Sequence, residues 1–270
     1  MSRKLHKFQT DAEYQAYSAS TEYTTPCVAL IVDTNVIYYD YGSNKPQAPD
    51  LSDFKGEFQE SSVGGDYYGK SAITKVHYIP SGITSFGDGF ENYSSLQEVT
   101  CEIPSGVTDM DFTFSKCSSL VNSPEIPSGV TSMYGTFNGC TSLVNVPVIP
   151  DSVENMMSTF GGCSKLLNVP NISSGVTDLY GTFIDCTSLV TAPTIKSSVT
   201  QMTKTFRNCS SLKELTLLPI TPPLMQSALE GCSSIETIYV PDSAVEDYKA
   251  ATNWSEFADK IKPLSSKPSE

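Results

Sequence analysis

Apolar residues repeat at a fixed interval of 23 positions from Val107 to Leu217, and no insertion interrupts the series. One column of this repeat holds the cysteines Cys117, Cys140, Cys163, Cys186, Cys209 and Cys232. A second holds Phe114, Phe137, Phe160, Phe183 and Phe206, and a third holds Ile103, Ile126, Ile149, Ile172, Ile195 and Leu218. Ser, Thr, Asn, Gly and Pro occupy most positions between the columns. A fixed period of this length predicts a solenoid, because one unit cannot bury its apolar side without stacking on its neighbours.

The apolar positions inside one unit are three or four residues apart, which is also the spacing of an amphipathic helix. A continuous helix is disfavoured, because Pro147, Pro150 and the glycines around them would break or weaken it. We therefore predict, for each coil, a short strand, a polar turn, an extended segment and a tight helical or 3₁₀ turn. In one unit these fall near residues 143–149, at 150–152, up to Phe160, and through Cys163.

The sequence at residues 126–143, Ile-Pro-Ser-Gly-Val-Thr-x-Met-x-x-Thr-Phe-x-x-Cys-x-Ser-Leu, resembles the BspA-like class of leucine-rich repeats. The resemblance extends over residues 79–264 and implies an α/β solenoid of 23-residue coils with short strands and 3₁₀ or helical turns. That class usually shows Leu-x-x-Ile-x-Ile-Pro before the turn, whereas this chain has one residue more. Prolines also stand where a strand would donate a hydrogen bond, at Pro124, Pro147, Pro170 and Pro193. The regular sheet of the family is therefore expected to be bulged or shortened here.

Residues 1–41 are expected to form a small α+β cap or attachment module. Thr10 and Glu13 have the spacing of a capping box, which predicts a helix over residues 11–18. Two β-rich runs at 28–32 and 36–39 predict a hairpin. Residues 42–72 are rich in Gly, Pro, Ser and acidic side chains and are interpreted as a loop or linker. The solenoid is expected over 73–240, with a first strand at 73–79 and an irregular first repeat that places Tyr93 in the cysteine column.

The opening segment also resembles the start of structural proteins from tailed phages and prophages of gut Bacteroidetes. The similarity lies in His6-Lys7-Phe8, Ala12-Glu13-Tyr14-x-Ala16-Tyr17, Val28-Ala29-Leu30-Ile31 and Tyr38-Tyr39. It implies an attachment or folding module on a virion component. A hairpin that shields the first coil is the alternative, since terminal repeats need polar caps.

Residues 241–264 are predicted to form a helical C-terminal cap. After a final strand at 238–241, one helix should begin at Ser243 and end near Ala251. A second should begin at Asn253 and place Trp254, Phe257 and Ile261 on one side, with the tryptophan as a lid over the open core. Residues 265–270 are expected to be a disordered tail.

Composition narrows the possible functions. The net charge of −13 argues against nucleic acid or anionic lipid as a partner recognised by charge. The chain has no long apolar run, so no membrane insertion is expected, and it does not open with a secretory signal in the form given. With two histidines, His6 and His77, and no cysteine pair or Cys/His cluster of ligand spacing, we expect no enzymatic activity, no metal site and no cofactor.

The cysteine column is predicted to consist of free, buried thiols that act as small apolar side chains. Neighbouring coils stack about 4.8 Å apart, which also permits disulfide pairing between them. Cys27 and Cys101 lie outside the column.

Two columns of outward-facing residues are candidate binding sites. The first pairs an apolar residue with a polar one on each coil, at Val121/Asn122, Val144/Asn145, Leu167/Asn168 and Val190/Thr191. The second is Asp111, Tyr134, Met157, Tyr180 and Thr203, in which the tyrosines could stack on a sugar or an apolar group. Asn122, Asn145, Asn168, Tyr134 and Tyr180 are the candidate contact residues. The alternative is that the asparagines satisfy backbone groups in turns and the tyrosines cover a neighbouring coil.

These features favour a non-enzymatic recognition or structural protein whose partner is a protein or a surface glycan. The opening segment favours a virion component, such as a fibre, decoration or host-attachment protein, which would also contact other virion proteins. The alternative is a bacterial cell-surface or secreted adhesin of the BspA-like kind, which binds host or matrix proteins.

Overall fold

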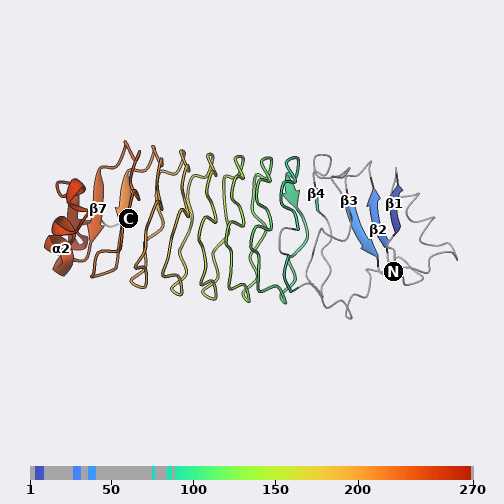
Figure 1. The fold of residues 1–270 in the computed structure, drawn as a ribbon, viewed down its shortest axis with the longest axis horizontal. Helices are drawn as coiled ribbons and strands as arrows, with labels where there is room; N and C mark the ends of the chain where they lie inside the picture. Colours follow the sequence, from blue (N-terminus) through green and yellow to red (C-terminus); the bar gives the residue numbers. More distant parts are fainter. Residues whose placement is uncertain are drawn as a thin grey trace.

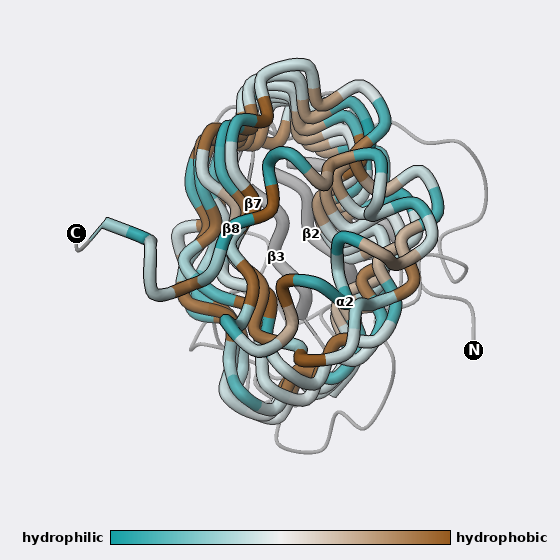
Figure 2. The backbone as a smooth tube through the Cα atoms, turned by 90° about the vertical axis from the view of Figure 1, so that its left-hand side faces the viewer, coloured by the Kyte–Doolittle hydropathy of each residue, from teal (hydrophilic) through white to brown (hydrophobic). Residues whose placement is uncertain are grey.

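The computed structural model of the protein describes residues 84–86 and 89–268, the strand at 75–76, and the backbone of three strands nearer the N-terminus. From residue 89 onward the coils stand side by side along the long axis of the molecule and end at a short helix (Figure 1). Viewed along that axis the coils superpose, and hydrophobic residues recur at the same places in successive coils (Figure 2). The chain is therefore a solenoid over its described repeats.

Three strands form the first sheet: β1 (Lys4–Phe8), β2 (Cys27–Ile31) and β3 (Val36–Asp40). β2 and β3 are antiparallel, as the hairpin prediction requires, and β1 pairs in parallel with β2, which the sequence pattern did not predict. The helix predicted over 11–18 and the linker at 42–72 lie outside the described residues. The strand expected at 73–79 is described only as β4 (Lys75–Val76), which pairs in parallel with β5 (Glu98–Val99).

The short strand predicted for each coil is wrong for the central coils. Residues 100–213, all of which the structure describes, contain no strand. Isolated parallel bridges take its place, and all but Ile195↔Leu217 follow two lines along the solenoid. One line includes Asn122↔Asn145 and Asn168↔Thr191, and the other includes Ser132↔Asn155 and Asp178↔Gln201. On the first line, where the strand was predicted, the physical reason is the proline two residues after each bridged position, which has no N–H to donate to a ladder.

Regular strands return where that proline is absent. Thr216 occupies the position of Pro193, and there the chain forms β6 (Glu214–Thr216), which pairs in parallel with β7 (Thr237–Val240). The extended strand reaches the next core position with one residue fewer. Leu217, not Leu218, is therefore the buried member of the isoleucine column, and it forms a bridge with Ile195.

Each coil turns through two residues with left-handed backbone. One lies two positions after the methionine column and the other directly precedes the cysteine column, as at Gly135 (φ 60°) and Gly139 (φ 75°). A Cβ at Gly135 would lie 2.7 Å from a ring carbon of Phe112, so glycine is favoured there by space as well as by φ, although Phe112 and Ser158 take the same backbone conformation in other coils. Hydrogen bonds between residues three apart close the tight turn predicted through Cys163, from Cys163 N to Phe160 O (3.0 Å) and from Leu166 N to Cys163 O (3.0 Å).

The core consists of the repeated columns themselves. The phenylalanine rings stack from Phe90 to Phe206, with centroids 5.3 to 5.7 Å apart and planes within 3° to 7° of parallel. Tyr93 takes the place of a cysteine in the first repeat and is 7% exposed. The methionine, valine and leucine columns are also buried.

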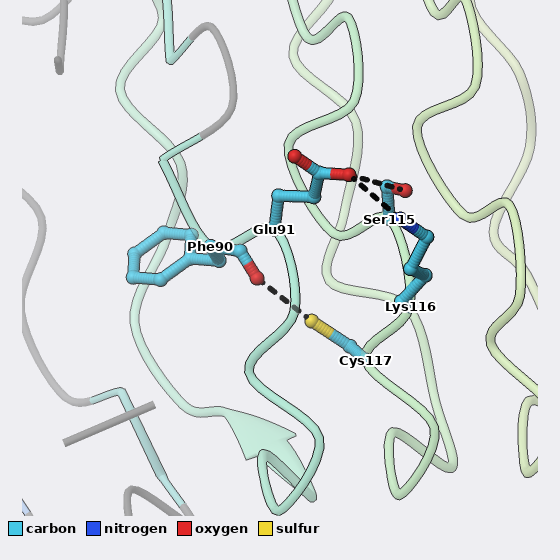
Figure 3. Close-up of polar contacts among 5 residues, drawn as sticks. All are labelled: Phe90, Glu91, Ser115, Lys116 and Cys117. Carbon is cyan, nitrogen blue, oxygen red and sulfur yellow. Dashed lines mark hydrogen bonds and ion pairs between the residues drawn. The ribbon is translucent and has the colours of Figure 1, made fainter. Parts of the chain in front are cut away.

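Thiol groups connect each coil to the one before it. Cys117 Sγ donates to the carbonyl oxygen of Phe90 (3.1 Å), close to the surface contacts that Glu91 makes with Ser115 and Lys116 (Figure 3). The same bond recurs at 3.0 to 3.1 Å from Cys140, Cys163, Cys186, Cys209 and Cys232 to Phe114, Phe137, Phe160, Phe183 and Phe206. The column is thus buried, as predicted, and its thiols are free.

Buried threonines form a second set of bonds between coils. The hydroxyl groups of Thr136, Thr159, Thr182 and Thr205 donate at 2.8 to 3.0 Å to the carbonyls of Met110, Met133, Met156 and Leu179. Exposed Ser and Thr side chains add weaker bonds, such as Thr141 Oγ1 to Ser118 O (3.3 Å). Side chains therefore add to the backbone hydrogen bonds between coils, such as those from Phe137 N to Thr159 O (2.9 Å) and from Gly139 N to Gly161 O (2.7 Å).

The C-terminal cap combines 3₁₀ turns, one helix and a strand. After β7 come η2 (Asp242–Ala244), α2 (Val245–Ala250), η3 (Ser255–Phe257), β8 (Ile261–Pro263) and η4 (Leu264–Ser266). The second helix expected from Asn253 is only the single turn η3. Ile261 begins β8, which pairs in parallel with β7, so β7 is not the final strand. A helix does not form there because the chain gains ladder bonds by adding to the sheet.

The end of the chain is ordered through Lys267, in contrast to the predicted tail. Lys267 Nζ lies 2.9 Å from Glu214 Oε1 and 2.9 Å from Thr216 Oγ1, so it fastens the last turn to β6. Trp254 is 1% exposed and donates from Nε1 to the carbonyl of Pro223 (2.9 Å). Its ring meets Tyr248 edge-on at 5.0 Å, and the tryptophan therefore closes the core as a lid.

Replacing Phe160 with alanine should remove one ring from the middle of the stack and lower the free energy of unfolding by about 3 to 5 kcal/mol. Chemical denaturation measures this change. Phe112→Ala, at a ring that is 37% exposed, is the control and should cost much less. Equal losses in the two variants would contradict the placement of Phe160.

The thiols of the cysteine column should resist iodoacetamide in the folded protein at pH 8. Burial raises the pKa of Cys117 to about 12 and of Cys232 to about 11, so the reactive thiolate is scarce at that pH, and the other column thiols are shifted in the same direction. After denaturation without reductant, intact-mass measurement should show at least six alkylated thiols. A smaller number would mean that column cysteines are paired.

Candidate binding surface

The first predicted column forms a continuous line on the solenoid surface. We call it the Asn ridge, and it comprises the residue pairs 121–122, 144–145, 167–168 and 190–191. Val121, Leu167 and Val190 are 42%, 47% and 43% exposed, and Val144 is half-buried. Asn122, Asn145, Asn168 and Thr191 are all exposed. Each coil therefore presents one apolar and one polar side chain at the same place.

Backbone bonds hold the ridge in register. Val144 N donates to Val121 O at 2.9 Å, and the equivalent bonds from Leu167 to Val144 and from Val190 to Leu167 are each 3.4 Å. These bonds and the bridges Asn122↔Asn145 and Asn168↔Thr191 fix the spacing at that of neighbouring strands, about 4.8 Å. The ridge side chains consequently repeat at one coil spacing.

The side-chain amides of the ridge asparagines have no partner among the described residues. Across residues 89–268, no hydrogen bond involves the amide groups of Asn122, Asn145 or Asn168. Asn171, only three residues after Asn168, accepts from Ile149 N (2.9 Å) and donates to Ile149 O (2.8 Å). Asn155 accepts from Met157 N (3.1 Å). Asparagines with a structural role in turns thus exist in this chain, and the ridge asparagines differ from them.

The four coils of the ridge carry no charged side chain at these positions. On the N-terminal side the series continues with Gln97 and Glu98, since Val121 N donates to Gln97 O. On the C-terminal side it continues with Lys213 and Glu214, and Glu214 is paired with Lys267. Charged side chains therefore lie at both ends of a neutral surface.

The second predicted column is largely committed to packing. Tyr134 is half-buried, meets Phe112 edge-on at 4.8 Å, and donates from its backbone N–H to the carboxylate of Asp111 (2.8 Å). Partial burial raises the pKa of that carboxyl group, and the neighbouring charge of Asp109 adds to the effect against the bonds from Ser132 and Tyr134. The tyrosine thus covers a neighbouring coil, as the alternative interpretation requires.

Tyr180 is the more accessible tyrosine of that column, at 39% exposure. Lys204 Nζ lies 5.8 Å from the centre of its ring, within the range of a cation–π contact. The column follows the line of bridges through Ser132 and Asp178, whereas the Asn ridge follows the other line. No hydrogen bond or ring contact of the described residues joins the two columns, so they are separate surfaces.

Comparison with known proteins agrees with this architecture. The family model for the BspA type leucine rich repeat region matches in six copies, over residues 61–189 and 135–252. The chain belongs to this family. Proteins with this repeat are generally non-enzymatic and typically mediate protein–protein interaction. No curated protein matches the chain.

Solved structures similar to this BspA-type repeat protein include a T. pallidum leucine-rich repeat protein, at 20% identity and a TM-score of 0.48, with 80% of this chain and 89% of that chain covered. A leucine-rich repeat protein from Bacteroides ovatus is 17% identical, with a TM-score of 0.38 and coverage of 89% and 75%. A leucine rich cell surface protein from Faecalibacterium prausnitzii is 19% identical, with a TM-score of 0.31 and coverage of 73% and 74%.

The described part of this BspA-type protein offers no metal centre and no membrane span. Among the described residues, no three or more His, Cys, Asp or Glu side chains are grouped so that they could hold a metal ion. No described helix is long and apolar enough to cross a bilayer.

Three exposed apolar side chains were not anticipated from the repeat pattern. Val148, Ile220 and Leu224 are 67%, 69% and 64% exposed. The segment that carries Ile220 and Leu224 is held by its carbonyls, since Tyr248 and Trp254 donate to Pro219 O and Pro223 O. The interruption of the repeat by Thr221-Pro222-Pro223 is the sequence signal for Ile220 and Leu224, whereas Val148 lies in a regular coil and has none.

Two alanine substitutions, made separately, test whether the ridge asparagines contribute to the stability of the fold. Asn171→Ala breaks two bonds to Ile149 and should lower the free energy of unfolding by about 1 to 3 kcal/mol. Asn145→Ala breaks none and should change it by less than about 0.5 kcal/mol. Chemical denaturation of the two variants gives the comparison, and a loss at Asn145 as large as that at Asn171 would assign Asn145 a structural role.

Proposed function

We propose that this protein is a non-enzymatic recognition protein that binds an extended partner along the Asn ridge. The observation that carries the proposal is the row of asparagine amides that lack partners, each beside an exposed or half-buried apolar side chain. Exposed polar groups on a rigid frame can exchange water for a partner without a change in the backbone. Because an apolar and a polar side chain recur on four coils, with an amide on three of them, weak contacts add along the ridge.

For the location we propose a virion, as part of a fibre, decoration or host-attachment protein that also contacts other virion proteins. The resemblance of residues 6–39 to phage structural proteins supports this location. A bacterial cell-surface or secreted adhesin that binds host or matrix proteins is the second candidate, and the repeat class supports it. Mass spectrometry of purified virions and of outer-membrane fractions separates the two, and recovery from membranes alone would exclude the virion.

Attachment assays test the role of the ridge. Beads coated with the full chain should attach to intact bacterial cells or immobilised matrix proteins, and Asn145→Asp combined with Asn168→Asp should reduce attachment at least about tenfold. The reason is that each substitution removes an amide donor and adds charge to a neutral contact surface. Thr177→Ala combined with Thr200→Ala changes two exposed side chains away from the ridge and serves as the control.

The melting temperature of both double variants should stay close to that of the parent protein, since none of these side chains is buried. Undiminished attachment of the ridge variant would exclude the Asn ridge as the binding surface.

A further inference from the structure

We propose that the partner of the Asn ridge is a linear, uncharged glycan that lies along the solenoid axis with about one sugar residue on each coil. The inference rests on the proposed function and names the chemical class of its partner. Three properties of the ridge carry it: spacing, hydrogen-bonding chemistry and the absence of charge.

The spacing of the ridge suits a sugar chain better than a peptide. Successive coils repeat at about 4.8 Å where their backbones are bridged, and the nearly parallel core rings are 5.3 to 5.7 Å apart. An extended peptide places side chains of one face about 6.6 to 6.8 Å apart, so it falls out of step within a few coils. One pyranose unit of an extended chain spans close to one coil and keeps step over all four.

The side chains of each ridge pair match the two kinds of surface on a sugar. A neutral amide offers two donors and an acceptor, so it can bind two adjacent hydroxyl groups at once. The apolar neighbour, Val121, Val144, Leu167 or Val190, can cover the C–H face of the ring. Hydroxyl groups just before the ridge, such as Thr141 and Ser164, donate to the preceding coil and keep acceptor lone pairs for a ligand.

Charge excludes the main alternatives. The ridge lies between Glu98 at one end and Lys213 and Glu214 at the other, and residues 103–217 carry eight acidic and six basic side chains. A uronic acid or sulfated polymer would lose hydration on the ridge without meeting a cationic side chain at the ridge positions. A charged peptide would find no counter-charge over four coils. A neutral polymer with hydroxyl groups can bind without an unpaired charge at the ridge.

Isothermal titration calorimetry with neutral oligosaccharides tests the proposal. Cello-, xylo- and manno-oligosaccharides of two, four and six residues are the probes, used with the full chain. At least one series should bind, with affinity that rises from two to four residues and then levels off, because the ridge offers four coils. Loss of two amide contacts in Asn145→Ala combined with Asn168→Ala should weaken tetrasaccharide binding at least about tenfold, whereas Thr177→Ala combined with Thr200→Ala should not.

Treatment of target cells distinguishes the glycan from the proposed function itself. Periodate, which cleaves vicinal diols, should abolish attachment of protein-coated beads, and protease should leave it intact. Loss after protease alone, with no oligosaccharide bound in calorimetry, would overturn the glycan and leave ridge-mediated recognition of a protein in place. Attachment that is unchanged in the ridge variants would overturn both the glycan partner and the proposed function.

Discussion

Hydrogen bonds between successive coils are the constraint on which the rest of this molecule depends. The prolines of the central coils remove the donors that a continuous parallel sheet would use. Buried hydroxyl and thiol groups connect the coils in addition to the backbone, and each of them reaches a carbonyl 26 or 27 residues earlier in the chain. Such bonds require the same side chain at the same place in every coil. The recurrence of threonine from Thr136 to Thr205 and of cysteine from Cys117 to Cys232 fits this requirement, in addition to their contribution to the core.

This arrangement also explains why the outer surface is regular. When every coil is fixed to its neighbour at several points, residues at equivalent outward positions come into line. Asn122, Asn145 and Asn168 then stand one coil apart with their amides directed to no internal partner. An extended ligand can meet such a row without reordering the protein, which lowers the entropic cost of binding. The proposed recognition of a neutral polymer is therefore a consequence of the same register that stabilises the fold.

The repeat pattern predicted the solenoid and its core from sequence alone, because a period of 23 leaves few alternatives. It did not predict where strands form, which depends on a single residue. The shorter spacing typical of the family occurs at Leu212, Leu215 and Leu217, and β6 forms there. In the central coils the spacing is one residue longer, as at Leu143, Val146 and Ile149, and only bridges form. The strand β8 was missed because Trp254, Phe257 and Ile261 have helical spacing, and only the tertiary contact with β7 decides against a helix.

The candidate surface was partly predictable. Alternation with buried columns placed the Asn ridge outside, but sequence could not separate Asn168, with a free amide, from Asn171, which bonds the preceding coil. Nor could it show that Tyr134 packs on Phe112, since that contact joins two coils. Both distinctions depend on which atoms of the neighbouring coil lie within reach.

The claim that buried side chains fasten the coils can be measured by removing three hydroxyl groups from the threonine column. Thr136→Val, Thr159→Val and Thr182→Val together keep the shape of the core and delete the bonds to Met110, Met133 and Met156. Chemical denaturation should show a loss of about 1 kcal/mol for each bond. The same three substitutions at the exposed Thr131, Thr141 and Thr187 should cost much less. Equal stability of the two triple variants would contradict the account.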